Sequence, residues 1–454
     1  MITEQPPRWA FLSSPRWQLG WQISLNLVLL LSALALWKWV TWRAVYLMAL
    51  VPIAIVPFSF ARLRLHSQCV HMFSSHSAPL ALFAILGMYC DATMIAQILT
   101  ARSGSPLPFL HSPGIAWIGT IWFSTYGLLL LGYATIGILR IGQRGVQRLL
   151  QQCQHRQPDA LPSLERRQFL QQLGLVGAGA PLFFSLSSVK LTYDFRVEER
   201  EISLPSWPRA LDGLRIAHLS DIHVGGSMDL PKLLDVAALT NAAKPDIVLH
   251  TGDFLTHRAG NFDAPLYEAL AQISAPYGQW ACLGNHDFDA PRRLVHRLRR
   301  AGVITLRNRV VTLPLDGRPI ELAGIDFLFQ RFDQAALYHR IVTSWGPRES
   351  ESRIPRILLN HDPRTFTALP DGCADLVLSG HTHGGHVGIQ LGKDQALSIV
   401  GLLGIPDQGV FHRKDMQMFV TRCVGFYGYP MRLGIPPEIA ILTLRSPRAE
   451  NLQK

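Results

Sequence analysis

This 454-residue chain contains few cysteines, and its first half contains few acidic side chains. Each scarcity excludes a class of protein. The six cysteines form no Cys-x-x-Cys pair, so neither a disulfide framework nor a zinc–thiolate site is predicted. Residues 1–189 contain 13 Lys/Arg but only 4 Asp/Glu, whereas residues 190–454 contain 30 Lys/Arg and 28 Asp/Glu. Because the basic excess is confined to the apolar first half, the net charge of +11 does not indicate nucleic-acid binding through a basic face.

The first half contains four stretches that are long enough, and free enough of charge, to cross a bilayer. They run over residues 17–37, 44–61, 78–101 and 115–139, and tryptophans lie near several of their ends, as interfacial anchors do. With the N-terminus inside, the inner segments carry ten Lys/Arg and the outer loops carry three. The positive-inside bias therefore favours this orientation in a bacterial inner membrane.

Asp91, inside the third stretch, has two interpretations. An intramembrane carboxylate is costly and by default indicates a functional site. The alternative is a side chain that faces neighbouring helices or lies close to a helix end.

A fifth apolar segment, residues 168–189, follows the sequence Glu165-Arg166-Arg167-Gln168-Phe169-Leu170. The sequence resembles a twin-arginine export signal, except that Glu165 stands where Ser or Thr is common. The alternative is an ordinary fifth transmembrane helix. Both interpretations place the second half of the chain on the periplasmic side. If the segment does not cross the membrane, the second half is cytoplasmic. We predict a transmembrane region of four helices at 1–145, a basic linker with the fifth apolar helix at 146–190, and a catalytic domain at 191–454.

The second half alternates short apolar runs with polar motifs and helix-like segments such as residues 230–243. This rhythm predicts an α/β domain whose site lies beyond the carboxyl ends of its strands. Glycines 252, 284 and 380 precede three of the motif residues and predict sharp turns that let the backbone pass close to ions. The apolar runs 214–220, 246–251, 279–283, 356–359 and 375–379 end at the motifs Asp221-Ile-His223, Gly252-Asp253, Gly284-Asn285-His286-Asp287, Asn360-His361-Asp362 and Gly380-His381-Thr382-His383.

Two carboxylates, one amide and four imidazoles in these motifs are enough to hold two cations that share a bridging group. Paired metals bind phosphoryl oxygens and activate a water, which is the equipment of phosphate-ester hydrolysis. A mixed set of carboxylates and imidazoles suits Mn, Fe or Zn more than Ca or Mg. The seven candidate ligands are Asp221, His223, Asp253, Asn285, His361, His381 and His383.

The motifs, in this order, resemble those of the calcineurin-like metallophosphoesterase superfamily over residues 212–445, especially its membrane-anchored and twin-arginine-exported bacterial members. The resemblance implies an αββα sandwich, here preceded by an all-α transmembrane domain of four to five helices. It implies one divalent metal ion on Asp221, His223, Asp253 and His383, and a second on Asp253, Asn285, His361 and His381. It also implies that His286 is a catalytic acid, with Asp287 as the residue that orients its ring.

The sequence therefore predicts a membrane-anchored phosphoesterase that cleaves a phosphodiester or pyrophosphate bond. A lipid-linked substrate fits a tethered enzyme, and hydrolysis of UDP-2,3-diacylglucosamine is one related activity, which requires a cytoplasmic site. The alternative is a membrane transporter or sensor with an accessory hydrolase domain, which Asp91 alone supports. The oligomeric state is not predicted.

Overall fold

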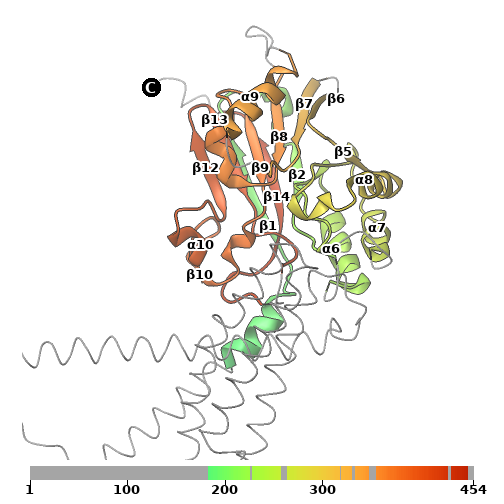
Figure 1. Cartoon of the computed structure of the whole chain (residues 1–454), viewed down its shortest axis with the longest axis vertical. Coiled ribbons are helices and arrows are strands. Elements are labelled where there is room, and N and C mark those ends of the chain that lie inside the picture. Colours follow the sequence, from blue (N-terminus) through green and yellow to red (C-terminus); the bar gives the residue numbers. More distant parts are fainter. Residues whose placement is uncertain are drawn as a thin grey trace, which may run out of the picture. The chain divides into compact units, whose positions relative to one another are not determined.

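The computed structural model describes residues 183–224, 228–256, 263–316, 318–329, 333–346, 354–427 and 431–447 (Figure 1). The chain divides into two compact units, Met1–Leu186 and Ser187–Lys454, and almost all described residues belong to the second. The predicted transmembrane region, Asp91 and the twin-arginine-like motif lie outside the described residues. Among the helices that are described, none is both long and apolar enough to cross a membrane.

The first of two large sheets contains six strands, and its central strands are buried runs. The residues Ile247–His250 are buried throughout, as expected of a parallel strand covered on both faces. One antiparallel pair, between β14 and β2, interrupts the otherwise parallel order. The spatial order is β1 (Arg196–Ser203), β14 (Glu438–Arg445), β2 (Arg215–Leu219), β3 (Ile247–His250), β4 (Gln279–Ala281), β5 (Val303–Thr305).

The second sheet also has six strands and is likewise mixed. Its four central strands run parallel, and an antiparallel strand closes each edge. The spatial order is β12 (Gly409–Arg413), β13 (Met416–Val420), β9 (Leu376–Ser379), β8 (Arg356–Asn360), β7 (Arg318–Ile325), β6 (Arg309–Leu315).

The two sheets pack face to face. Their shared core contains Ile216 and Leu249 from the first sheet together with Leu322, Leu359 and Leu378 from the second, and all five are fully buried. Burial of aliphatic side chains at such an interface is the main favourable term in folding. This core holds the carboxyl ends of both sets of parallel strands at one rim of the sandwich.

Helices cover the outer faces (Figure 1). On the first sheet lie α6 (Leu230–Ala242), α7 (Ala264–Leu270) and α8 (Pro291–Arg300), whose buried side chains share a second core with that sheet. On the second sheet lies α9 (Gln334–Thr343). The predicted α/β class is confirmed for this part of the chain, and the apolar runs that precede the motifs form β2, β3, β4, β8 and β9.

The helix predicted at 230–243 is α6, which ends one residue earlier. Asp229 caps it, because its carboxylate accepts a hydrogen bond from the backbone N–H of Lys232 at 3.3 Å. Leu233, Val236, Ala237 and Thr240 are its buried residues, a spacing that places them on one helical face.

Candidate metal centre

Both sheets contribute to one cluster of polar side chains at the rim of the sandwich. Asp221, Asp253 and Asn285 follow β2, β3 and β4 of the first sheet, and His361 and His381 follow β8 and β9 of the second. Because the parallel strands of each sheet end at the same edge, packing of the two sheets brings the two sets together. All seven predicted ligands take part in contacts within this cluster.

Three ligand atoms surround the Nε2 atom of His361, and the four atoms together lie close enough to share one ion. The distance from this atom is 3.3 Å to Oδ2 of Asp253, 3.2 Å to Oδ1 of Asn285 and 3.1 Å to Nδ1 of His381. The other ring nitrogen of His361 donates to the backbone carbonyl of Thr251 at 2.7 Å, which leaves Nε2 available for a cation. These four residues are the set predicted for one of the two metals.

Asp221 and Asp253 form the centre of the other set. Nε2 of His223 lies 3.6 Å from Oδ2 of Asp253 and 3.8 Å from Oδ1 of Asp221, and Nε2 of His383 lies 3.2 Å from Oδ1 of Asp221. Oδ2 of Asp253 thus faces ring nitrogens of both sets, His223 on one side and His361 on the other. A carboxylate in this position can bridge two ions.

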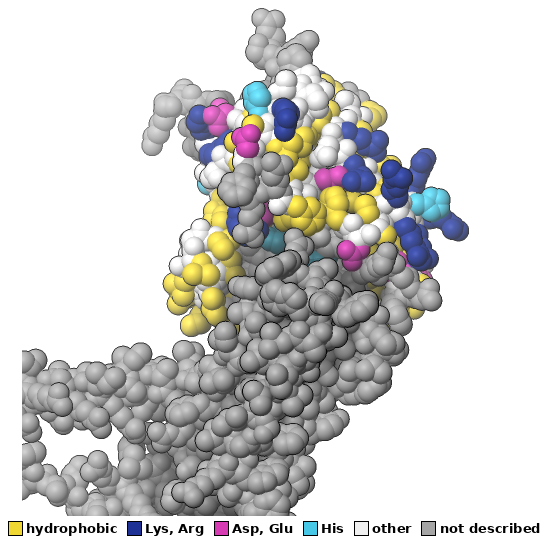
Figure 2. Space-filling view, viewed as in Figure 1, with side chains coloured by type: hydrophobic (Ala, Val, Ile, Leu, Met, Phe, Trp, Pro, Cys, Tyr) yellow, Lys and Arg dark blue, Asp and Glu magenta, His cyan; other side chains and the backbone are white. Residues whose placement is uncertain are grey.

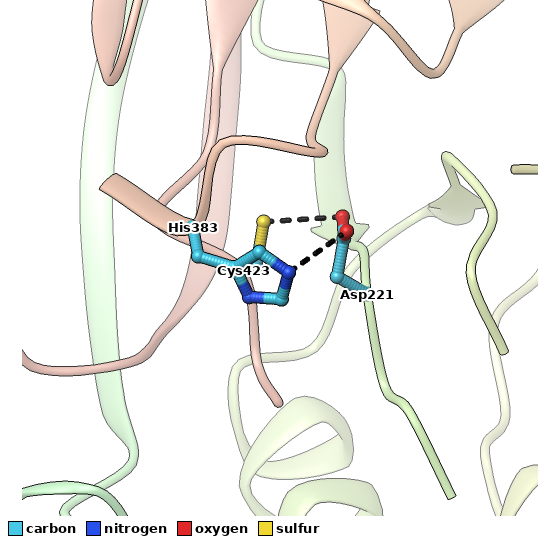
Figure 3. A group of neighbouring side chains, drawn as sticks. All are labelled: Asp221, His383 and Cys423. Carbon is cyan, nitrogen blue, oxygen red and sulfur yellow. Dashed lines mark hydrogen bonds and ion pairs between the residues drawn. The ribbon is translucent and has the colours of Figure 1, made fainter. Parts of the chain in front are cut away.

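Figure 3 shows how the two oxygens of Asp221 are used differently. Oδ2 accepts three hydrogen bonds, from the hydroxyl of Ser220 at 2.5 Å, the backbone N–H of His381 at 2.9 Å and the thiol of Cys423 at 3.1 Å. Oδ1 faces His383 instead. The three donors therefore fix the carboxylate so that Oδ1 points into the cluster.

Backbone strain is concentrated at the predicted ligands. Five of the seven have left-handed backbones: Asp221 (φ 52°), His223 (φ 50°), Asp253 (φ 51°), His381 (φ 69°) and His383 (φ 52°). A residue other than glycine held in this region costs about 1–3 kcal/mol, and such strain persists where the surrounding structure imposes it, typically at functional sites. The fold thus sustains several unfavourable conformations in order to aim these side chains at one point.

The predicted role of the three motif glycines needs one correction. Gly252 does adopt a left-handed turn (φ 92°), but Gly284 has an extended backbone with φ −90° and ψ −177°. A Cβ atom at Gly284 would overlap the carboxylate of Asp253, and one at Gly380 would overlap Oδ2 of Asp221. Close approach to a carboxylate, and not a turn, is what requires glycine at positions 284 and 380.

Charge and burial set the protonation of the cluster. Burial lowers the pKa of His223 to about 3, so its imidazole is neutral. Neither of its buried ring nitrogens makes a hydrogen bond with a described residue. Burial also acts to lower the pKa of His361, but the carboxylates of Asp253 and Asp221 outweigh it and raise the pKa to about 10. A cation at Nε2 of His361 would therefore have to displace a proton.

These observations meet the requirements of divalent metal ions. Three groups of side chains have potential ligand atoms within 4.8 Å of one another, and each group contains Asp221 or Asp253. The groups are Asp221, His223 and Asp253; Asp253, His361 and His381; and Asp221, His383 and Cys423. The unpaired nitrogens of His223 are in the neutral form that binds metals. The residues fit two ions, although the individual ligand roles remain predictions.

His286 lies beside the His223 side of the cluster. Its ring centroid is 5.1 Å from that of His223 and 4.3 Å from that of Tyr427, and its backbone N–H donates to Oδ1 of Asp253 at 2.8 Å. The side chain is half-buried, so it can reach both the cluster and a bound molecule.

Asp287 does not have the partner that the sequence predicted. Its carboxylate accepts four backbone N–H groups, from Asp253 (2.8 Å), Phe254 (3.0 Å), Leu255 (3.4 Å) and Gly284 (2.9 Å). Both oxygens are occupied in this way, so the carboxylate holds the two loops that carry Asp253 and Asn285. The expectation that Asp287 orients the His286 ring is replaced by this positioning role.

Cys423, Arg432 and Arg364 are among the residues near the cluster that were not predicted. Cys423 (φ 65°) donates to Asp221, and the buried Arg432 donates to the backbone carbonyls of His383 (3.2 Å), Cys423 (3.3 Å) and Gly425 (2.6 Å). Both belong to the segment after β13, which contains no ligand motif to reveal them. Arg364 lies 3.2 Å from Nε2 of His381, and its place two residues after Asp362 was the only signal.

Comparison with known proteins agrees with this geometry. The calcineurin-like phosphoesterase family profile matches residues 214–385, which contain all the predicted site residues. The chain is 30% identical over 298 residues to the uncharacterised metallophosphoesterase YkuE of Bacillus subtilis, covering 63% of this chain and 99% of that protein. This chain belongs to the calcineurin-like phosphoesterase family. It is a metal-dependent hydrolase of phosphoric ester or pyrophosphate bonds.

Two further relatives carry functional names. Over 239 residues the chain is 28% identical to the phosphodiesterase YaeI of Escherichia coli, covering 51% of this chain and 82% of that one. Over 303 residues it is 26% identical to the UDP-2,3-diacylglucosamine pyrophosphatase LpxG of Chlamydia trachomatis, covering 54% of this chain and 88% of that one.

Proposed function

We propose that this protein is a membrane-anchored phosphoesterase with two metal ions, and that its substrate is a lipid-linked phosphodiester or pyrophosphate. The observation that carries the catalytic part is the position of Asp253, whose Oδ2 lies 3.6 Å from His223 and 3.3 Å from His361. One carboxylate between two groups of ligands is the arrangement that a binuclear centre needs.

Asp221, His223, Asp253 and His383 would hold one ion, and Asp253, Asn285, His361 and His381 the other. When bound, two such ions polarise the phosphoryl oxygens and lower the pKa of a water that attacks phosphorus. Mn, Fe or Zn suits this mixed donor set.

His286 supplies the proton for the departing oxygen. Imidazole is the side chain best suited to proton transfer near neutral pH. The His286 backbone is fixed to Oδ1 of Asp253 at 2.8 Å, and its ring packs on Tyr427, so the imidazole is held beside the cluster without being one of the predicted ligands.

Arg364 supplies a positive charge at the edge of the site. Its Nε and Nη2 atoms bind the carboxylate of Asp362 at 2.9 and 2.6 Å, and its side chain remains 45% exposed. A guanidinium held in this way orients one phosphoryl oxygen of the substrate beside His381.

The lipid-linked part of the proposal has two supports. Four apolar stretches of about bilayer length, with Asp91 as their one charged residue, precede the catalytic domain in the sequence. One relative is named as a pyrophosphatase of UDP-2,3-diacylglucosamine, an acylated nucleotide sugar. An enzyme tethered to a bilayer encounters such amphiphiles at high local concentration.

Hydrolysis assays test the proposal directly. We expect the full-length protein, loaded with Mn²⁺, to hydrolyse bis(4-nitrophenyl) phosphate. A lipid-linked pyrophosphate, represented in detergent micelles by UDP-2,3-diacylglucosamine, should be hydrolysed at least about 10-fold more efficiently, because binding of the remote part of a substrate accelerates its turnover. Chelation of the metal should abolish both activities. Absence of diester hydrolysis with every one of Mn²⁺, Fe²⁺ and Zn²⁺ would refute the proposal.

The side of the membrane decides which lipid is available. We propose a periplasmic catalytic domain in the bacterial inner membrane, on the basis of the Lys/Arg distribution and the segment at 168–189. Alkaline phosphatase fused after Lys454 should then be active in cells. An inactive fusion would place the site in the cytoplasm and bring UDP-2,3-diacylglucosamine to the front as the substrate.

A further inference from the structure

A small ribbon beside the metal centre carries an unusual number of exposed apolar side chains. Within the described part of the chain, the strands β10 (Gly388–Gln390) and β11 (Ala396–Ser398) form a two-stranded sheet of their own and lead into the short helix α10 (Ile399–Leu402). Figure 2 shows apolar side chains gathered over the region that Figure 1 labels β10 and α10. The ribbon patch consists of Ile389, Leu391, Leu397, Ile399, Leu402 and Leu403, each between 49% and 73% exposed.

The ribbon patch is continuous and free of charge. Ile389 and Leu397 are direct cross-strand partners, so their side chains lie next to each other on one face. The only charged residues between 387 and 406 are Lys393 and Asp394. Both are tied back to β1, because Arg200 donates to the carbonyl of Lys393 at 2.8 Å and to the carboxylate of Asp394 at 2.5 Å.

The ribbon patch is fixed to the loop that carries His383. A Cβ atom at Gly385 would lie only 2.8 Å from Cβ of Ser398, so the ligand loop packs directly on the residue that caps α10. Ser398 donates to the carboxylate of Asp407 at 2.5 Å, and Thr382 donates to the Asp407 carbonyl at 2.9 Å. The patch and the metal centre therefore keep a fixed separation.

The composition of the patch favours a lipid surface over a protein partner. Protein interfaces concentrate their binding energy in Trp, Tyr and Arg, and leucine is under-represented among these residues, whereas the ribbon patch contains leucine and isoleucine only. A group of exposed apolar side chains gathered on a protein surface marks an interaction site. The 182 residues that precede the described domain include four apolar stretches of bilayer length, which would deliver the domain to a membrane.

We infer that the ribbon patch inserts into the surface of the bilayer and holds the metal centre at the level of the lipid headgroups. This inference rests on the proposed function and narrows its substrate to a phosphate that lies at the headgroup layer. Apolar side chains at an interface reach about 5–10 Å into the boundary between headgroups and acyl chains. The scissile phosphate then reaches the cluster without leaving the membrane.

Fluorescence quenching in the full-length protein tests the insertion. Leu402→Cys, labelled with a thiol-reactive fluorophore in vesicles of phosphatidylethanolamine and phosphatidylglycerol, should be quenched at least about twofold by a nitroxide-labelled phospholipid. Ile304→Cys on β5 is the matched exposed control and should not be quenched, and the labelled unsubstituted protein gives the background of native thiols. Equal, unquenched signals at both positions would overturn the inference. That result is expected if another part of this chain or a second copy covers the patch.

Kinetics separates this inference from the proposed function. The double variant Leu402→Asp/Leu403→Asp should raise KM for UDP-2,3-diacylglucosamine in the same vesicles by about 10- to 100-fold, as expected from losing the burial of leucine side chains. Turnover of bis(4-nitrophenyl) phosphate should not change. An unchanged KM in the double variant, with diester hydrolysis intact, would contradict the insertion of the ribbon patch but not the proposed function. Absence of diester hydrolysis by the unsubstituted protein would contradict the proposed function.

Discussion

Asp253→Asn is expected to lower the turnover of bis(4-nitrophenyl) phosphate by at least about 10³-fold, the scale seen when one member of a cooperating catalytic set is removed. Oδ1 of Asp253 accepts the backbone N–H of His286 at 2.8 Å, so the amide oxygen of an asparagine would take that position. Its NH₂ group would then replace Oδ2, which faces Nε2 of His361 at 3.3 Å and of His223 at 3.6 Å. A bridging anion would become a neutral donor.

The measurement is steady-state hydrolysis together with metal content by mass spectrometry. Both should fall, because the bridge belongs to both ligand sets. Asp371→Asn is the matched control, since this exposed carboxylate pairs with Arg413 and Lys414 away from the cluster and its loss should change turnover less than about twofold. Wild-type turnover in the Asp253 variant, with its fold intact by circular dichroism, would show that Asp253 is not a ligand of the metal centre.

Gly284→Ala is expected to have the next largest effect, although it adds only one methyl group. The backbone angles of Gly284 suit any residue, so the effect comes from space alone. The new Cβ would lie 2.7 Å from Cγ of Asp253 and 2.5 Å from its backbone nitrogen, and the carboxylate would have to move. A displacement of about 1 Å in a catalytic group costs about 10²-fold in rate, and overpacking costs about 1–3 kcal/mol in the free energy of unfolding.

Turnover and denaturant unfolding measure the two parts of this prediction. Gly392→Ala is the control, because no heavy atom lies within 4 Å of a Cβ at that position. It should leave turnover unchanged and alter the free energy of unfolding by less than about 0.5 kcal/mol. Equal behaviour of the two variants would mean that the Asp253 carboxylate tolerates relocation and does not bridge.

The strands and motifs of the active rim were predictable from sequence because each strand ends at a motif. Continuous apolar runs such as 246–251 mark buried parallel strands, and the polar residues after them fall at the same edge. The grouping of Asp221 with His383, 162 positions apart, followed only from the family resemblance, since strand order across two sheets is a tertiary property.

Features that depend on tertiary packing were not predictable. The thiol of Cys423 and the guanidinium of Arg432 reach the cluster from a segment without motifs, because β14 returns the chain to the first sheet beside β2. Asp287 looked like a catalytic partner of His286 by adjacency, yet the backbone N–H groups of a distant loop engage its carboxylate. Sequence proximity does not report the direction of a side chain.

The division of the ligands between the two sheets has a mechanical consequence. Each predicted set takes donors from both layers of the sandwich, with His383 joining one set from the second sheet and His361 and His381 joining the other. Bound cations would therefore cross-link the two sheets at this rim. The melting temperature would rise with metal occupancy, because only the folded sandwich binds the ions. By the same coupling, a substitution that weakens the aliphatic packing between the sheets, far from the rim, would lower the affinity for metal without changing any ligand.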